Sequence, residues 1–288
     1  MAVKATDYNS KNQATWCPGC GNFAIHTSIK KALSELNISP SESFMAFDIG
    51  CNGNGADKIT MYGFKGLHGR AIPLAVGAHL ANRNFTVFAD IGDGGCFHEG
   101  LDHLVHAIRS NYNITILIHN NQNFALTTGQ ATVSTKQDKP MYGLPSGMPE
   151  RNINISNFII NLEPSFFAKT YSGDPLGMSE IIKKAVEHKG CSVIEIMQLC
   201  PTYIKEFTPE WAAQNIKKVE EVEDYDNKSL TKAKDILSHN SPVYTGIIYK
   251  DENIPTFYDS LESRKDSLTE LVDEVKPVDI KKLLAYFK

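Results

Sequence analysis

The stretch that decides the fold is residues 85–121, FTVFADIGDGGCFHEGLDHLVHAIRSNYNITILIHNN. It predicts an apolar strand over 85–92, a helix over 97–110 and a second strand over 114–119. The second strand shows no alternation of polar and apolar residues, which is typical of a parallel sheet that is buried on both faces. This stretch therefore predicts a strand–helix–strand unit of an α/β fold.

The same succession of strands and helices continues on both sides of this unit. Apolar runs predict further strands over 43–50, 165–173 and 191–200. Helical spacing of apolar residues predicts helices over 21–36, 69–82 and 174–188. We therefore expect a mostly parallel sheet with helices on both faces over residues 1–204.

Two segments have weaker patterns. Residues 127–164 are rich in Gly, Pro, Ser, Thr and Asn, so we expect a long loop or a mobile cover there. Residues 205–288 are more charged, and we expect a C-terminal extension that packs on the main domain or on a partner subunit. Its predicted elements are a helix near 229–238, a strand over 242–249 and a helix over 277–287.

The bulk composition excludes several classes of protein. The 288 residues carry a net charge of −4, which argues against general nucleic-acid binding. We find no run of about 20 apolar residues, so we expect no membrane association, and the polar first residues resemble no signal peptide. We therefore expect a cytoplasmic protein whose six cysteines are reduced.

Polar residues follow the two strands of the opening stretch. Asp93 follows the first strand within a glycine-rich turn, and Asn121 follows the second strand 28 residues later. Because both strands end at the same edge of a parallel sheet, we expect these side chains to lie close together. A carboxylate, an amide oxygen and a backbone carbonyl form a site that suits Mg²⁺, and a diphosphate bound to that metal is its natural occupant.

The cysteines suggest a second site. The segment WCPGCGN at 16–22 places Cys17 and Cys20 in a C-x-x-C pattern, while Cys51 and Cys200 each end a predicted strand. From spacing alone, a structural zinc fits nearly as well as an iron–sulfur cluster, and disulfide exchange fits less well because no strand precedes Trp16. The remaining cysteines and the helical histidines are expected to be packed or exposed rather than functional: Cys96, Cys191, His26, His79, His103 and His106.

The turn G-D-G followed by N-N at this distance resembles the thiamine diphosphate motif. The resemblance implies that the side chains of Asp93 and Asn121 and the backbone carbonyl of Asn123 hold Mg²⁺. Gly94 then contacts phosphate. The other glycines expected to bind the cofactor are Gly50, Gly69 and Gly92.

A longer series of motifs makes the resemblance specific. WCPGCGN, IGCNG around Cys51, LHGR at 67–70, the G-D-G and N-N pair, TTGQ at 127–130 and LCPTY at 199–203 occur in this order. Together they resemble the β subunit of 2-oxoacid:ferredoxin oxidoreductases of the pyruvate:ferredoxin type, over roughly residues 14–204. The resemblance implies that one [4Fe–4S] cluster is held by Cys17, Cys20, Cys51 and Cys200.

The same resemblance implies a reaction and its partners. The activity is the CoA-dependent oxidative decarboxylation of a 2-oxoacid, pyruvate first, with electrons passed through the cluster to ferredoxin. An α subunit, or a fused γ–α subunit, carries the pyrimidine-binding domain and the catalytic glutamate. We therefore expect a heterodimer or a dimer of heterodimers, and an isolated chain that is inactive.

The substrate side departs from the pattern of the family. His68, Leu126 and Thr128 are expected near the substrate and the thiazolium ring. Asn54 and Thr128 stand where relatives often carry other residues, and the segment 141–152 matches the family poorly. Two alternatives stay open at this point: a non-redox thiamine diphosphate decarboxylase or carboligase subunit with a structural zinc, and a non-catalytic metal-binding assembly protein.

Overall fold

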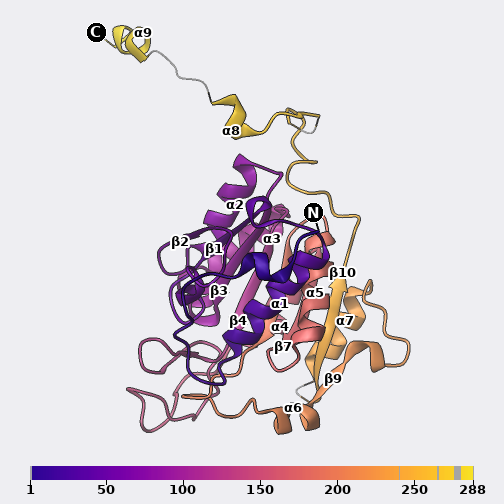
Figure 1. The fold of residues 1–288 in the computed structure, drawn as a ribbon. Helices are drawn as coiled ribbons and strands as arrows, with labels where there is room; N and C mark the ends of the chain where they lie inside the picture. The colour runs from indigo at the N-terminus through magenta and orange to yellow at the C-terminus, as the bar shows by residue number, and fades with distance from the viewer. Residues whose placement is uncertain (1, 240, 265, 276–279, 288) are drawn as a thin grey trace.

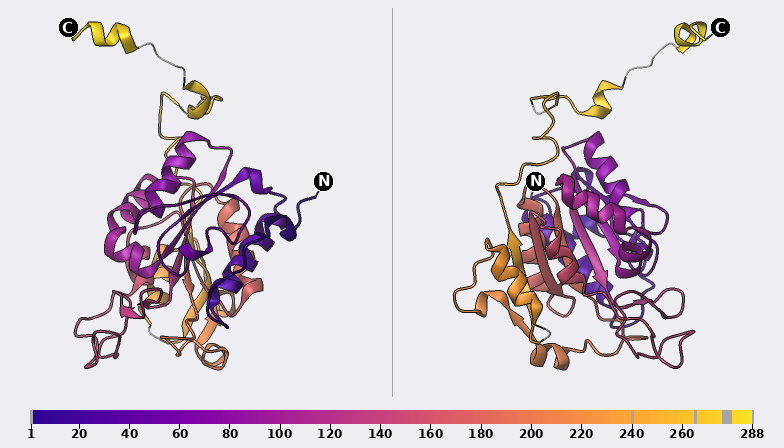
Figure 2. Two further views of the ribbon diagram at one scale, coloured as in Figure 1. Left: turned by 60° about the vertical axis from the view of Figure 1, so that its left-hand side comes forward. Right: turned by 180° about the vertical axis from the view of Figure 1, so that it is seen from behind.

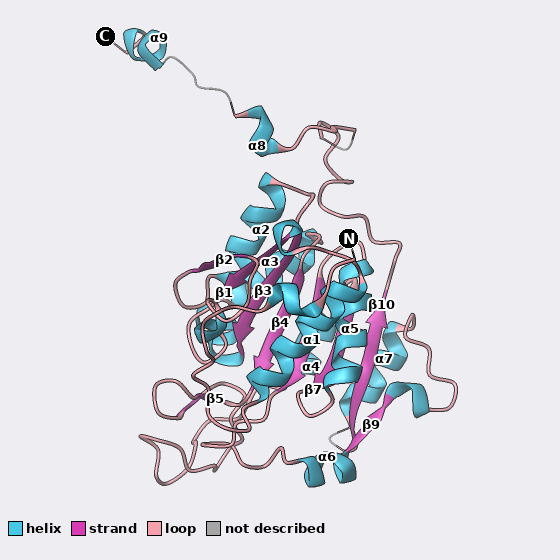
Figure 3. Ribbon diagram, viewed as in Figure 1, coloured by secondary structure: helices cyan, strands magenta, loops and turns pink. Residues whose placement is uncertain are grey.

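A twisted sheet with helices on both faces forms the body of the protein (Figures 1 and 3). The computed structural model describes residues 2–239, 241–264, 266–275 and 280–287. Within these residues, eight strands lie in the order β2-β1-β3-β4-β8-β7-β10-β9. Their bounds are β1 Ser43–Phe47, β2 Tyr62–Lys65, β3 Thr86–Gly92, β4 Thr115–Asn120, β7 Phe166–Tyr171, β8 Ser192–Met197, β9 Ile216–Lys218 and β10 Val243–Lys250. Neighbouring strands run parallel except for β7 and β10, so the predicted mostly parallel α/β sheet is confirmed.

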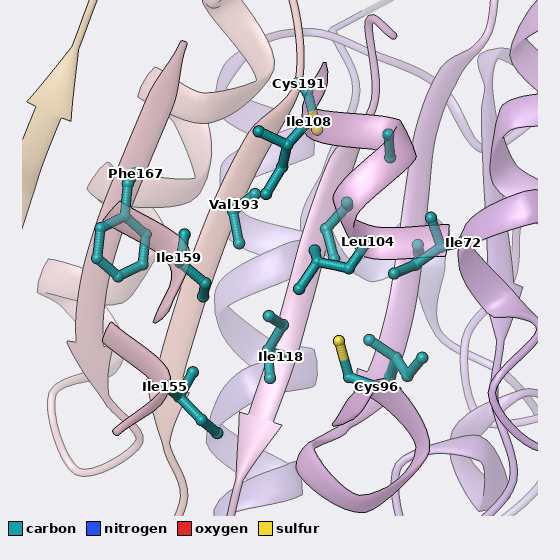
Figure 4. Close-up of a cluster of buried hydrophobic side chains, with 14 of the residues drawn as sticks. Ile72, Cys96, Leu104, Ile108, Ile118, Ile155, Ile159, Phe167, Cys191 and Val193 are labelled. Carbon is teal, nitrogen blue, oxygen red and sulfur yellow. The ribbon is translucent and has the colours of Figure 1, made fainter. Parts of the chain in front are cut away.

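Two apolar layers hold the helices against the sheet. One layer joins the sheet to α1 and α5, and the other joins it to α2, α3, α4 and α7 (Figure 4). In β4, Ile116 and Ile118 belong to one layer and Leu117 to the other, as strand geometry requires. The helices are α1 Gly21–Glu35, α2 Ala71–Ala81, α3 Leu101–Ser110, α4 Ile155–Asn161, α5 Pro175–Glu187, α6 Pro209–Asn215, α7 Leu230–Ser238, α8 Leu271–Glu274 and α9 Ile280–Ala285. None of the described helices is both long and apolar enough to cross a membrane.

Part of the C-terminal extension is built into the main sheet. Strand β10 pairs antiparallel with β7, β9 pairs parallel with β10, and α7 packs beside α4. Beyond it, α8 and α9 extend away from the body (Figures 1 and 2). Arg83 anchors the base of this arm, because its side chain pairs with Glu270 and lies 4.5 Å from the centre of the Tyr258 ring. The division of the chain at residue 204 stays a prediction.

Several local predictions differ from the structure or extend beyond the described residues. The segment 127–164 is not a continuous loop, because Asn154 caps the helix α4, whose isoleucines are buried against the sheet. The edge strand β2 was missed because its four residues are all exposed and lack an apolar pattern. The predicted helix over 97–110 begins as a π-helical turn over Gly95–Glu99. Of the predicted helix over 277–287, residues 277–279 lie outside the described residues, and α9 occupies Ile280–Ala285.

Candidate active site

Four loops meet at the carboxyl edge of the sheet, which is the lower end in Figure 3. They follow β1, β3, β4 and β8, whose carboxyl ends lie side by side because these strands are parallel neighbours. This edge is where open α/β sheets bind ligands. The short hairpin of β5, Asn123–Phe124, and β6, Gln130–Ala131, covers it.

The loops enclose two adjoining cavities. The first, of about 110 Å³, is lined by residues 49–52, His68, 92–95, Asn121 and 123–127. The second, of about 210 Å³, is lined by residues 15–17, Cys20, Cys51, Asn54, Asn121, Ala125, Leu126, Gln198 and 200–203. Cys51, Asn121, Ala125 and Leu126 line both. The predicted cofactor site and the predicted cysteine site are therefore neighbours.

Asp93 is the charged group of the first cavity. Its side chain is 1% exposed and accepts hydrogen bonds from the hydroxyls of Thr132, at 2.6 Å, and Ser134. Burial raises the pKa of Asp93. A carboxylate in this position needs a cation to balance its charge, because two hydroxyl donors only partly replace water.

Asn121 and Asn123 form a tight turn beside Asp93. The Oδ1 atom of Asn121 accepts the backbone N–H of Asn123 at 3.1 Å, and the Nδ2 atom of Asn123 donates to the Asn121 carbonyl at 2.7 Å. The buried Oδ1 atom of Asn123 has no hydrogen-bond partner among the described residues. Carboxylate and amide oxygens around one cavity are hard ligands, so this donor set fits Mg²⁺.

Two glycines of the first cavity are required by close contacts. A Cβ atom on Gly94 would lie 2.2 Å from the Phe124 ring, and one on Gly95 would lie 1.8 Å from the Asp48 carboxylate. Gly50, Gly92 and Gly94 line the cavity, as expected, but Gly69 does not. Bare backbone at these positions leaves N–H groups accessible to an anion such as a diphosphate.

Asp48 is a buried carboxylate that the sequence analysis missed. Its Oδ1 atom accepts the backbone N–H of Gly69 at 2.7 Å, and its Oδ2 atom has no hydrogen-bond partner among the described residues. Burial raises the pKa of Asp48 to about 6. The residue before Gly69 is His68, which lines the first cavity, and its Nδ1 atom lies 2.9 Å from Glu99. Asp48 therefore holds the turn that presents His68.

The four predicted cluster cysteines line the second cavity. Cys20 is the N-cap of α1, and the backbone N–H of Gly21 donates to the Leu199 carbonyl, which ties the C-x-x-C loop to the Cys200 loop. Burial, followed by the neighbouring thiols, raises the pKa of Cys51 to about 12. Burial also raises the pKa of Cys20. Thiols with these raised pKa values become thiolates when a cation binds them.

The four thiols of the second cavity are a donor set for a metal centre. Among the described residues, no group of three or more His, Cys, Asp or Glu side chains is placed to hold a metal ion. A structural zinc takes four thiolates at one ion. A four-iron cluster also takes four thiolates, one at each iron. The chemistry of the four cysteines therefore fits either centre.

Side-chain donors approach two of the sulfurs. The Nε2 atom of Gln198 lies 3.8 Å from the sulfur of Cys20, and the hydroxyl of Thr202 lies 3.3 Å from the sulfur of Cys17. Gln198 is 1% exposed, and its backbone N–H donates to the carbonyl of Asn120. It therefore connects the cysteine cavity to the turn that carries Asn121. These donors were missed because the pairing of distant loops leaves no local pattern.

The remaining predicted residues fall into two groups. Leu126 lies in the wall of both cavities and is half exposed, whereas Thr128 lies in neither wall and adopts a left-handed φ of 82°. Among the cysteines and histidines that were expected to be packed or exposed, Cys96, Cys191, His26 and His79 are buried, His103 is partly buried and His106 is exposed. Burial lowers the pKa of both His26 and His79 to about 4.

Two family comparisons cover most of the chain. Residues 48–196 match the family described as the thiamine pyrophosphate enzyme, C-terminal TPP-binding domain. Residues 200–266 match the family described as the C terminal of the pyruvate ferredoxin oxidoreductase beta subunit.

Individual relatives agree with these families. A 2-oxoacid:ferredoxin oxidoreductase subunit beta of Saccharolobus solfataricus is 34% identical over 88% of this chain and 87% of its own length. The 2-oxoglutarate oxidoreductase subunit KorB of Mycobacterium tuberculosis is 33% identical over 69% of this chain and 54% of its own length. In a solved structure of the 2-oxoglutarate:ferredoxin oxidoreductase from Magnetococcus marinus with 2-oxoglutarate, coenzyme A and succinyl-CoA bound, a chain superposes with a TM-score of 0.84. That chain is 28% identical, and the match covers 99% of this chain and 96% of that one.

Proposed function

This chain belongs to the β subunits of the 2-oxoacid:ferredoxin oxidoreductases, and we propose that it performs the thiamine- and cluster-binding part of that activity. The reaction converts a 2-oxoacid, CoA and two oxidised ferredoxins into an acyl-CoA, CO₂, two reduced ferredoxins and a proton. The observation that carries the proposal is the pair of adjoining cavities, one lined by hard oxygen atoms and the other by four cysteines.

The first cavity would hold the diphosphate end of thiamine diphosphate and its Mg²⁺. Asp93 and Asn121 would supply side-chain ligands, and Asn123 a backbone carbonyl. The cofactor, when bound, acts as an electron sink for the carbon that loses CO₂. The chain's own contribution is to orient it: Gly94 lets the backbone approach the phosphates, and the hydroxyls of Thr132 and Ser134 fix the Asp93 carboxylate.

The second cavity would hold a [4Fe–4S] cluster on Cys17, Cys20, Cys51 and Cys200. Because Cys51 and Asn121 line both cavities, electrons would leave the first site over a short path. Burial, together with the neighbouring thiols, raises the pKa of Cys20 and of Cys51, so the cage needs the positive charge of iron to hold thiolates.

The active site of this proposal is shared with a second protein chain. Leu126 at the mouth of both cavities is half exposed, and the apolar rings of Tyr142 and Tyr203 are exposed as well. An α, or fused γ–α, subunit would cover this face and supply the pyrimidine-binding domain and its glutamate. The proposed assembly is a heterodimer or a dimer of heterodimers in the cytoplasm. Pyruvate stays the first predicted substrate, and 2-oxoglutarate, which relatives name, is the second.

Anaerobic purification with the α partner tests the proposal. We expect about four iron and four sulfide per chain, bound thiamine diphosphate, and 2-oxoacid- and CoA-dependent reduction of ferredoxin. Zinc together with thiamine diphosphate would instead support a non-redox decarboxylase or carboligase. Metal without thiamine diphosphate would support an assembly protein. Turnover of a 2-oxoacid by the isolated chain would contradict the shared active site.

A further inference from the structure

Trp16 forms a wall between the cysteine cavity and an outer groove. Its side chain lines both, and the groove has a volume of about 280 Å³. The indole N–H of Trp16 donates to the Cys51 carbonyl at 2.7 Å, so the ring is fixed to the cysteine cage. The ring also meets Phe23 edge to face, with 5.2 Å between centroids. Trp16 therefore joins the cysteine cavity to the groove, on a side of the molecule where Cys17 is exposed.

The groove carries lysines although the chain is acidic overall. The net charge of the chain is −4, yet the sequence from Tyr8 to Ser34 contains no Asp or Glu and carries Lys11, Lys30 and Lys31, of which Lys31 is paired with Glu35. Lys30 lies in the groove wall, where its ammonium group donates to Asn9 at 3.1 Å. Among the described residues, the wall includes two lysines and no carboxylate, although Lys58 is paired with the adjacent Asp57.

The groove also has an apolar centre. Phe23 is 42% exposed, lines the groove together with Lys30 and contacts the Trp16 ring. An exposed aromatic residue with charged residues around it is the usual composition of a protein-binding patch. The groove therefore has both the contact area and the charge for a protein partner.

We propose that this groove is the docking surface for the electron acceptor, a small acidic iron–sulfur protein of the ferredoxin class. The inference rests on the proposed function, because it needs a cluster behind Trp16. Each oxidised ferredoxin takes one electron from the reduced cluster, so two dockings follow each 2-oxoacid consumed, and no bond is made or broken. The lysines steer the acidic partner, and Phe23 supplies the desolvated contact.

The test compares two electron acceptors in the assembled α–β complex. Lys30→Glu and Lys11→Glu reverse charges at and beside the groove, and Lys217→Glu reverses an exposed charge on β9 as the matched control. The readout is kcat/KM for ferredoxin divided by the rate with a small viologen dye, which needs no docking surface. We expect this ratio to fall about 10-fold in the two groove variants at low salt and to stay unchanged in the control. Added salt should lower the wild-type ratio toward that of the variants.

Each outcome decides between the inference and the proposed function. If both groove variants keep the wild-type ratio, or if Lys217→Glu lowers it equally, the docking surface is wrong while the proposed function stands. A loss of dye reduction in Lys30→Glu alone would indicate a folding defect in that variant. The ferredoxin-to-dye ratio of Lys11→Glu, at an exposed position, then decides whether the docking surface is right. A wild-type complex without iron and without dye reduction would overturn both.

Discussion

Asp48→Asn tests whether a charge buried behind the wall of the first cavity lowers the stability of the protein. The side chain of Asp48 is fully buried, one carboxylate oxygen accepts the Gly69 N–H, and the other has no hydrogen-bond partner among the described residues. Burial raises its pKa from the ordinary 3.8 to about 6. A difference of about two units corresponds to ~3 kcal/mol at neutral pH. Asparagine keeps the acceptor for Gly69 and removes the charge.

The sign of the effect follows from proton linkage. Between about pH 4 and pH 6 the folded chain binds a proton at Asp48 that the unfolded chain has lost, so wild-type stability falls as the pH rises through this window. The Asn variant lacks this fall. Without cofactor at pH 7, we therefore expect Asp48→Asn to be more stable than wild type by up to ~3 kcal/mol.

Urea denaturation between about pH 4 and pH 8 measures both quantities. Asp235→Asn, which removes an exposed carboxylate on α7, is the matched control and should stay within about 0.5 kcal/mol of wild type. If Asp48→Asn is no more stable than wild type at pH 7, the prediction is wrong. It is also wrong if the stability of the variant falls between pH 4 and pH 6 as much as that of wild type, because the buried charge would then not lower the stability. A buried charge that lowers stability is expected where a site requires it.

Three further substitutions, one of them with a control, test the two cavities separately. Asp93→Ala should weaken Mg²⁺-dependent thiamine diphosphate binding more than about 100-fold, measured by calorimetry, and should leave the iron content unchanged. Unchanged binding would show that the diphosphate does not bind at Asp93. Cys200→Ala should lose the cluster, and the control Cys191→Ala, at a buried cysteine, should keep its iron. Equal iron content in the two variants would show that Cys200 is not a ligand of the cluster. Gln198→Leu should make the cluster's reduction potential more negative in an EPR-monitored titration, because it removes a donor to Cys20. A potential equal to that of wild type would show that the contact has no electrostatic effect.

The parallel core could be predicted because its signal is local. The strand β4 shows no alternation of polar and apolar residues, which identifies a buried strand without any knowledge of distant residues. The glycine-rich turn containing Asp93 likewise identifies the carboxyl end of β3. Both cavities then follow from one rule, that loops after neighbouring parallel strands share an edge. The rule also accounts for Cys51 and Cys200, which follow β1 and β8.

What could not be predicted depends on pairing between distant segments. Thr132 and Ser134 reach Asp93 only because the β5–β6 hairpin folds back over the edge, and nothing in their own sequence marks this. The strand β10 joins the sheet antiparallel to β7, and an apolar run does not reveal its direction. Asp48 follows the ordinary buried strand β1, so its missing hydrogen-bond partner became visible only in three dimensions.

The central claim is that this chain carries electrons from one cavity to the other once an α partner has completed the first. The most direct measurement is the visible absorbance of the anaerobic α–β complex, recorded before and after a 2-oxoacid and CoA are added without ferredoxin. The account predicts that the broad absorbance of the oxidised cluster bleaches in the complex and stays unchanged in the isolated chain. A complex that consumes the 2-oxoacid while this absorbance persists would contradict it.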